Sequence, residues 1–249
     1  MLVSSQSKIG RLRMLHLLER LDAAGGLAIS FYMPPGLADS EIERTLSIVA
    51  GTAEALLEIT SAAARSETGA ILFWGEEEKC LVLPPFSITE KLFCSSYDVE
   101  ALRSLLKQEL MVALILLRLG AYAIGVFQGD RLVSSKVGTG HIHARHKKGG
   151  SSQQRFARGR QKQIEFFFDS VCGRVRERLE PYVGQLDYMV YGGERNTLLS
   201  FRRRCEFLKS VNDRVMRRTL NVRTPKQATL EAAIEEVWAS EVISWREVN

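Results

Sequence analysis

Apolar residues recur along the chain with two spacings, which separate the expected helices from the expected strands. Apolar side chains lie three and four positions apart in residues 40–64 and 154–179, and this helical period predicts two long amphipathic helices. Short apolar runs bounded by glycine, proline or polar turns predict strands. These runs are residues 27–33, 70–74, 80–83, 111–117, 121–127, 132–137, 188–191 and 215–222.

Shorter helices are predicted at residues 14–21, 198–209 and 227–245, and Asp98 is a candidate cap for a further helix that carries Leu102 and Leu106. The three strands of residues 111–137 follow one another closely and predict a meander. Strands and helices alternate after it, which indicates an α/β protein. We expect two α/β domains, residues 1–108 and 109–249.

Composition narrows the class of protein without identifying it. The chain is 45% apolar and 25% charged, as is ordinary for a globular protein. Its longest apolar run is too short to span a membrane, and its beginning lacks the apolar core of a secretory signal. The four cysteines form no C-x-x-C pair, which predicts buried, reduced thiols in a cytoplasmic protein.

Positive charge is concentrated in residues 141–162. This stretch holds seven Lys/Arg and no acid, and since the chain is formally +5, the other residues sum to −2. We interpret the stretch as a loop and helix end that bind RNA phosphates. The absence of acids and the two adjacent glycines both count against the alternative, a charged loop that is merely solvated. The predicted RNA-binding residues are Arg145, His146, Lys147, Lys148, Arg155, Arg158, Arg160 and Lys162.

The centre of this stretch is uncharged. Gly149 and Gly150 permit the backbone to pass close to a partner. Ser151 and Gln154 have the spacing of a capping box at the start of the following helix. This leaves Gln153 exposed at the tip, beside Ser152, without a local structural role.

No autonomous catalytic or metal centre is visible. The spacing of His141, His143 and His146 lacks a nearby Asp, Glu or Cys, so it is a poor zinc pattern. A phosphate-binding loop of the nucleoside triphosphatase type is missing, as are a catalytic triad and a carboxylate pair. We therefore expect no metal and no cofactor.

The sequence of residues 147–160, KKGGSSQQRFARGR, resembles the catalytic loop of the class-I peptide chain release factors of eukaryotes and archaea. Residues 121–137 and 188–194 are similar to the strands that precede and follow that loop in the family. The first domain follows the order of the codon-reading domain, but it lacks an Asn-Ile-Lys-Ser decoding motif. We also expect no third domain that recruits a translational GTPase.

The tip departs from the Gly-Gly-Gln of those factors. With residues 155–158 in register, Ser151 occupies the position of the glutamine, and Gln153 follows two residues later. The pattern Gly-Gly-x-Ser-Gln resembles the Vms-type release-factor-like hydrolases of ribosome-associated quality control. That resemblance implies a reduced release-factor N-domain followed by a ribonuclease-H-like release domain.

The same resemblance implies an activity. The expected reaction is codon-independent hydrolysis of peptidyl-tRNA on stalled large ribosomal subunits. Gln153, Gly149, Gly150 and Ser152 would form the catalytic tip, with ribosomal RNA and peptidyl-tRNA as partners of a monomer. Two alternatives stay open, a non-catalytic RNA-binding module that recognises stalled ribosomes and a nuclease that acts on the tRNA 3′ end.

Overall fold

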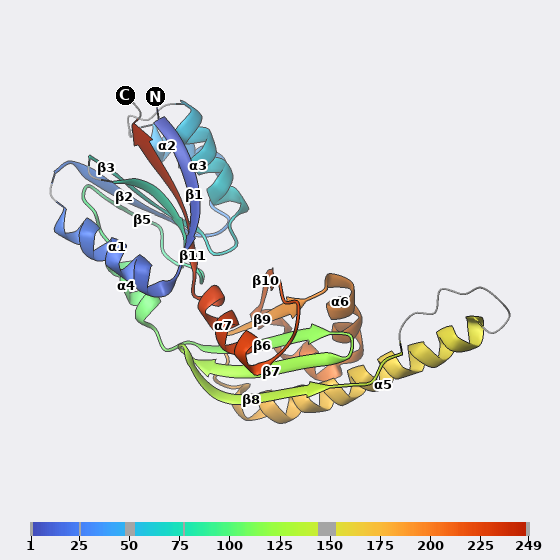
Figure 1. Ribbon diagram of the computed structural model, residues 1–249. Helices are drawn as coiled ribbons and strands as arrows, with labels where there is room; N and C mark the ends of the chain where they lie inside the picture. Colours follow the sequence, from blue (N-terminus) through green and yellow to red (C-terminus); the bar gives the residue numbers. More distant parts are fainter. Residues whose placement is uncertain (1, 25, 48–52, 77, 144–152, 248–249) are drawn as a thin grey trace. The chain divides into compact units, whose positions relative to one another are not determined.

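The computed structural model describes residues 2–24, 26–47, 53–76, 78–143 and 153–247 (Figure 1). The chain forms two compact units. The first consists of Met1–Gln108 with Val237–Asn249, and the second is Glu109–Glu236. The sequence-based division assigned all residues after 108 to the second domain, whereas in the structure the end of the chain belongs to the first unit.

The first unit is a six-stranded sheet in the order β1-β11-β4-β3-β2-β5 with helices on both faces. Its elements are β1 (Leu2–Ile9), α1 (Arg11–Ala23), β2 (Ala28–Met33), α2 (Asp39–Leu46), α3 (Ala53–Arg65), β3 (Ala70–Gly75), β4 (Lys79–Leu83), β5 (Leu92–Cys94), α4 (Glu100–Lys107) and β11 (Ser240–Glu247). Alternate residues of a strand point to opposite faces. In β3, Leu72 and Trp74 accordingly join a cluster with α2 and α3, and Ile71 and Phe73 join one with α1 and α4.

Two predicted helices differ from the structure. The helix expected over residues 40–64 is two helices, α2 and α3, and residues 48–52 between them lie outside the described residues. The helix expected over residues 227–245 was wrong in its second half. Helix α7 (Gln227–Val237) ends early, and the strand β11 pairs between β1 and β4, where Trp245 packs against Trp74.

The second unit is a five-stranded sheet in the order β10-β9-β6-β7-β8. Its elements are β6 (Met111–Arg118), β7 (Ala121–Gln128), β8 (Arg131–Thr139), α5 (Gln153–Leu179), the 3-10 turn η1 (Glu180–Tyr182), β9 (Tyr188–Gly193), α6 (Arg195–Arg204), the 3-10 segment η2 (Glu206–Arg214), β10 (Val215–Leu220) and α7. An antiparallel meander, β6 to β8, is extended by β9 parallel to β6 and by β10 parallel to β9. This is the strand arrangement of ribonuclease-H-like sheets, so the predicted α/β fold class is confirmed.

The central strand β6 is buried along seven of its eight residues because helices cover both faces of the sheet. Helices α5 and α6 contribute Phe168, Val171 and Phe201 to the cluster on one face. Helix α7 lies on the other face, so close that a Cβ added to Gly125 would be 2.7 Å from a methyl of Leu230. None of the described helices has an apolar stretch long enough to cross a membrane.

The prediction of four reduced thiols was wrong for one pair. Cys172 of α5 and Cys205, the residue after α6, form a disulfide across a sequence separation of 33, with their Cα atoms 5.4 Å apart. Cys80 and Cys94 are free. The pairing of these two cysteines depends on how α5 and α6 pack on the sheet, so their spacing in the sequence does not predict it.

We expect reduction of this disulfide to lower the free energy of unfolding. Closing a loop of this length removes about 3–4 kcal/mol of conformational freedom from the unfolded chain. Denaturant unfolding with and without dithiothreitol measures the difference. In the variant Cys172→Ser/Cys205→Ser the effect of the reductant should vanish, and equal midpoints for the oxidised and reduced parent would contradict the prediction.

Two glycines near the basic stretch should respond oppositely to alanine. A Cβ at Gly140 would collide with the ring of Phe167, whereas a Cβ at Gly159 in α5 would meet nothing within 4 Å. Gly140→Ala should therefore cost about 1–3 kcal/mol through overpacking. Gly159→Ala should add about 0.5–1 kcal/mol of helix stability. Thermal unfolding of the two variants tests the difference in sign.

Candidate nucleic-acid interface

The predicted catalytic tip lies almost entirely outside the described residues. This applies to Gly149, Gly150 and Ser152, and to the predicted RNA-binding residues Arg145, His146, Lys147 and Lys148. Gln153 is the first residue of α5. The capping box of Ser151 and Gln154 also stays a prediction.

The structure does describe both flanks of the basic stretch, which are tied to each other by hydrogen bonds. After β8 the chain continues alongside α5 toward the N-terminal end of that helix, where the backbone N–H of His143 donates to Oε1 of Gln163 at 3.0 Å. The Nε of Arg160 donates to the carbonyl of the same His143, also at 3.0 Å. Arg160, which the sequence predicted to bind RNA, therefore uses part of its guanidinium to hold the strand exit against the helix.

Helix α5 is divided into an exposed basic end and a buried anchor. Figure 1 shows its N-terminal part, in yellow, running past the end of the sheet. Residues 155–159 are exposed on every side of the helix, and they include Arg155 and Arg158. Phe156, one of the apolar residues behind the prediction of an amphipathic helix over residues 154–179, is 55% exposed. Farther along the same helix, Phe167, Phe168, Val171, Val175 and Leu179 are buried in the core of the unit.

The charge of this exposed end is not compensated along the helix. Residues 153–162 contain no acid, and the nearest carboxylates on α5, Glu165 and Asp169, face Arg204 of α6. Arg204 donates to Asp169 through Nε and a terminal nitrogen, at 2.5 and 2.7 Å. This hydrogen bonding lowers the pKa of Asp169. Glu165 and Asp169 thus neutralise Arg204 of α6, while Glu177 pairs with Arg174 and Arg178 farther along α5. The positive field of the basic end therefore persists.

A groove of about 670 Å³ lies between β8 and α5, beside the base of the loop. Lys136, His141, Lys162 and Arg174 line it, and its lining includes no carboxylate. Phe166, on its rim, is 76% exposed. Arg174 donates to Glu177 at 2.9 Å, so the ammonium groups of Lys136 and Lys162 are the main phosphate ligands that the groove offers. Ammonium groups next to an exposed aromatic ring suit a nucleic-acid strand, because they bind phosphates while the ring stacks on a base.

The histidines do not form a metal site within the described part of the chain. The rings of His141 and His143 lie edge to face, with centroids 4.8 Å apart. No cluster of three metal-binding side chains occurs among the described residues, and His146 lies outside them.

The chain has a second basic region, which was not predicted from the sequence. Residues 195–226 contain ten Lys/Arg and only two acids. This excess was hidden because the charges of all residues outside 141–162 were added together, so the acids elsewhere cancelled it. The sequence-based interpretation of the positive charge as one local feature was therefore wrong. Three arginines of this region line a separate pocket, described below.

Comparison with curated proteins identifies archaeal relatives. Peptide chain release factor subunit 1 of Archaeoglobus fulgidus is 29% identical over 112 residues, which are 45% of this chain and 28% of that protein. The protein of the same name from Aeropyrum pernix is 26% identical over 198 residues, 68% of this chain and 52% of that protein. The chain spans about half or less of the length of these relatives.

Solved structures with a similar arrangement include an archaeal translation termination factor, aRF1, at 17% identity. It has a TM-score of 0.39, with 92% of this chain and 73% of that chain covered. The Vms1 mitochondrial localization core has 13% identity and a TM-score of 0.42, with 83% and 89% covered.

A family model described as the Actinobacteria/chloroflexi VLRF1 release factor matches residues 111–243. The match begins with β6 and extends into β11, so it includes the whole basic stretch and the helix that carries it. Because it covers more than half of the 249 residues, the chain belongs to the family of Actinobacteria/chloroflexi VLRF1 release factors.

Proposed function

We propose that this protein hydrolyses peptidyl-tRNA on stalled large ribosomal subunits without reading a codon. One observation carries the proposal. In a member of a release-factor family, the sequence Gly-Gly-Ser-Ser-Gln immediately precedes the exposed, acid-free end of α5. The reaction belongs in the cytoplasm, where ribosomes translate, and we propose that a monomer performs it.

Gln153 positions the attacking water in this proposal. An amide does not titrate near neutral pH, so it cannot be a general base, but it both donates and accepts hydrogen bonds. It orients a water toward the ester that joins peptide and tRNA, and the rate gain comes from orientation. Gly149 and Gly150 permit close approach to the RNA, and Ser152 sets the position of the neighbouring amide.

The cationic residues deliver this tip to its substrate. Arg155 and Arg158 on the exposed end of α5 neutralise phosphates of ribosomal RNA or tRNA, together with Lys162 at the groove. Arg145, His146, Lys147 and Lys148 extend the contact along the loop. Arg160 contributes mainly by holding the carbonyl of His143.

Gln153→Ala should slow peptide release from isolated large subunits that carry peptidyl-tRNA by at least about a hundredfold, the scale expected for a lost positioning group. The measurement is single-turnover release of a labelled nascent chain. Gln161→Ala is the matched control, since Gln161 is an exposed glutamine of the same helix that bonds to Glu165. It should release at the parental rate.

Release by Gln153→Ala at the parental rate would eliminate the proposed mechanism. Binding without turnover by the parent would indicate a non-catalytic module instead. Cleaved tRNA among the products would indicate a nuclease, so the tRNA is recovered and its 3′ end examined.

Arg155→Gln and Arg158→Gln should each weaken binding to large subunits. Each should also reduce the slope of log affinity against log salt by about 1, because each removes roughly one phosphate contact. Equilibrium sedimentation with subunits over a salt series gives the slope. Arg44→Gln removes an exposed charge from the first unit and should leave the slope unchanged; an equal loss there would indicate a general charge effect.

A further inference from the structure

Positive charge on this protein is gathered at two places. Residues 141–162 and 195–226 together hold seventeen Lys/Arg and two acids, which leaves 17 basic and 27 acidic residues elsewhere. The remainder of the chain is therefore clearly acidic. Charge segregated in this way on an acidic background marks surfaces that meet polyanions.

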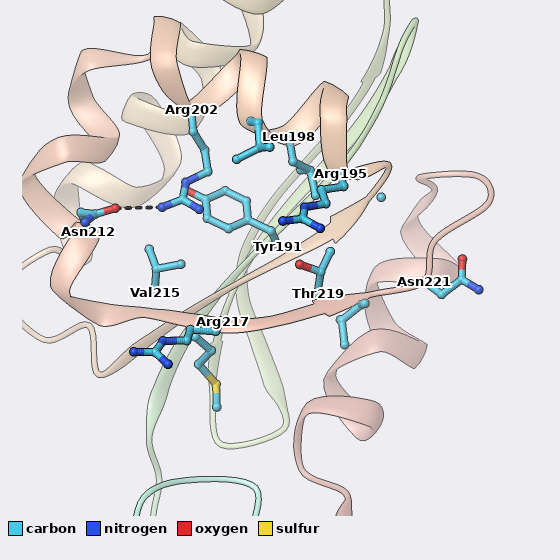
Figure 2. Close-up of a pocket in the computed structure, with 13 residues that line it drawn as sticks. Tyr191, Arg195, Leu198, Arg202, Asn212, Val215, Arg217, Thr219 and Asn221 are labelled. Carbon is cyan, nitrogen blue, oxygen red and sulfur yellow. Dashed lines mark hydrogen bonds between the residues drawn. The ribbon is translucent and has the colours of Figure 1, made fainter. Parts of the chain in front are cut away.

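The second basic region forms a pocket of about 700 Å³ between α6 and the edge strand β10 (Figure 2). Arg195 and Arg202 are seven residues apart on α6, so two helical turns place them on one face. Arg217 lies on β10 across the pocket. None of the thirteen lining residues is acidic.

Two of the charges in the pocket, Arg195 and Arg202, are kept out of ion pairs with the described residues. Arg204 of the same helix bonds to Asp169, and Lys209 bonds to Glu206, but both lie outside the pocket lining. Arg195 and Arg202 make no salt bridge to any carboxylate of the described residues. Guanidinium groups gathered without carboxylates suit a bound phosphate, which they recognise through paired hydrogen bonds.

Tyr191 of β9 forms the floor of the pocket. It is 3% exposed, and its buried hydroxyl has no hydrogen-bond partner among the described residues. The guanidinium of Arg202 lies 5.0 Å from the centre of its ring and donates to Oδ1 of Asn212 at 2.9 Å. Burial raises the pKa of Tyr191 to about 12, so the hydroxyl keeps its proton and remains a donor. An unpartnered buried hydroxyl is costly unless a partner arrives.

We propose that this pocket is a second RNA-binding site, which holds a backbone phosphate between Arg195, Arg202 and Arg217. Thr219 and Asn221, which also line it, offer hydrogen bonds to the ribose hydroxyls that distinguish RNA from DNA. The identity of this RNA as ribosomal RNA or tRNA rests on the proposed function. The pocket is separate in sequence from the catalytic loop, and it adds a backbone contact that fixes the orientation of the domain on its RNA.

The test is direct binding of a fluorescently labelled RNA hairpin over a salt series. Arg195→Gln/Arg217→Gln removes two exposed charges and should lower the slope of log affinity against log salt by about 0.7–0.9, the value for one phosphate that is no longer neutralised. Arg203→Gln/Lys209→Gln removes the same charge from exposed positions outside the pocket. It should change the slope by less than half as much.

Tyr191→Phe provides a readout that a purely structural tyrosine would not give. Because the hydroxyl has no partner in the described residues, its removal should leave the midpoint of thermal unfolding unchanged or raise it. Binding of the hairpin should nevertheless weaken by about tenfold to a hundredfold, the cost of one hydrogen bond to a charged group. Parental RNA affinity in this variant and in Arg195→Gln/Arg217→Gln would overturn the proposal.

Two further results would also overturn it. One is an equal loss of slope in the control double variant, which would show a general charge effect. The other is tighter binding of polyglutamate than of the hairpin, with the same dependence on Arg195 and Arg217, which would identify an acidic protein partner. Since binding is measured without release, failure of Gln153→Ala to slow release would remove the proposed function while leaving this result intact.

Discussion

The burial of one half of α5 is the constraint on which the rest of the second unit depends. Phe167, Phe168, Val171, Val175 and Leu179 are nearly inaccessible to solvent, and side chains of this kind together contribute on the order of 10 kcal/mol. That anchor, with the disulfide from Cys172, holds the helix so firmly that its basic end can stand clear of the sheet. A rigid helix can present a reactive tip without a pocket of its own.

The distribution of charge follows from the same arrangement. Arg204 bonds to Asp169 and approaches Glu165, so these two acids of α5 are paired with α6 and do not compensate the basic residues at the N-terminal end of α5. Arg195 and Arg202, on the other face of α6, meet Arg217 over Tyr191 instead. One pair of helices thus separates a charge-compensated surface from two cationic ones. Such separation favours fast, salt-dependent capture of polyanions.

Much of the fold could be predicted because its causes are local. Apolar residues predict the meander of β6, β7 and β8 and the buried half of α5. Their spacing along each element also indicates which of its faces is buried. The strands β1 and β11 were missed because their pairing is long-range. Most of β1 is exposed at a sheet edge, so it has no apolar run that predicts a strand. The apolar residues of β11 are buried because β11 pairs with β4, a strand far away in the sequence.

Residue order alone was enough to show the resemblance to release factors, which the family match confirms, because a loop motif is contiguous. The Gly-Gly-x-Ser-Gln tip around Gln153 and the basic residues beside it stay predictions from the same stretch. Packing decided the rest. It joined Cys172 to Cys205, and it turned Arg160 toward the carbonyl of His143. The parallel pairing of Thr219 with Tyr191 helped to bring three distant arginines to the lining of one pocket. Charge can be counted along a chain, but which charges converge depends on sheet register and helix position, which are properties of the folded molecule.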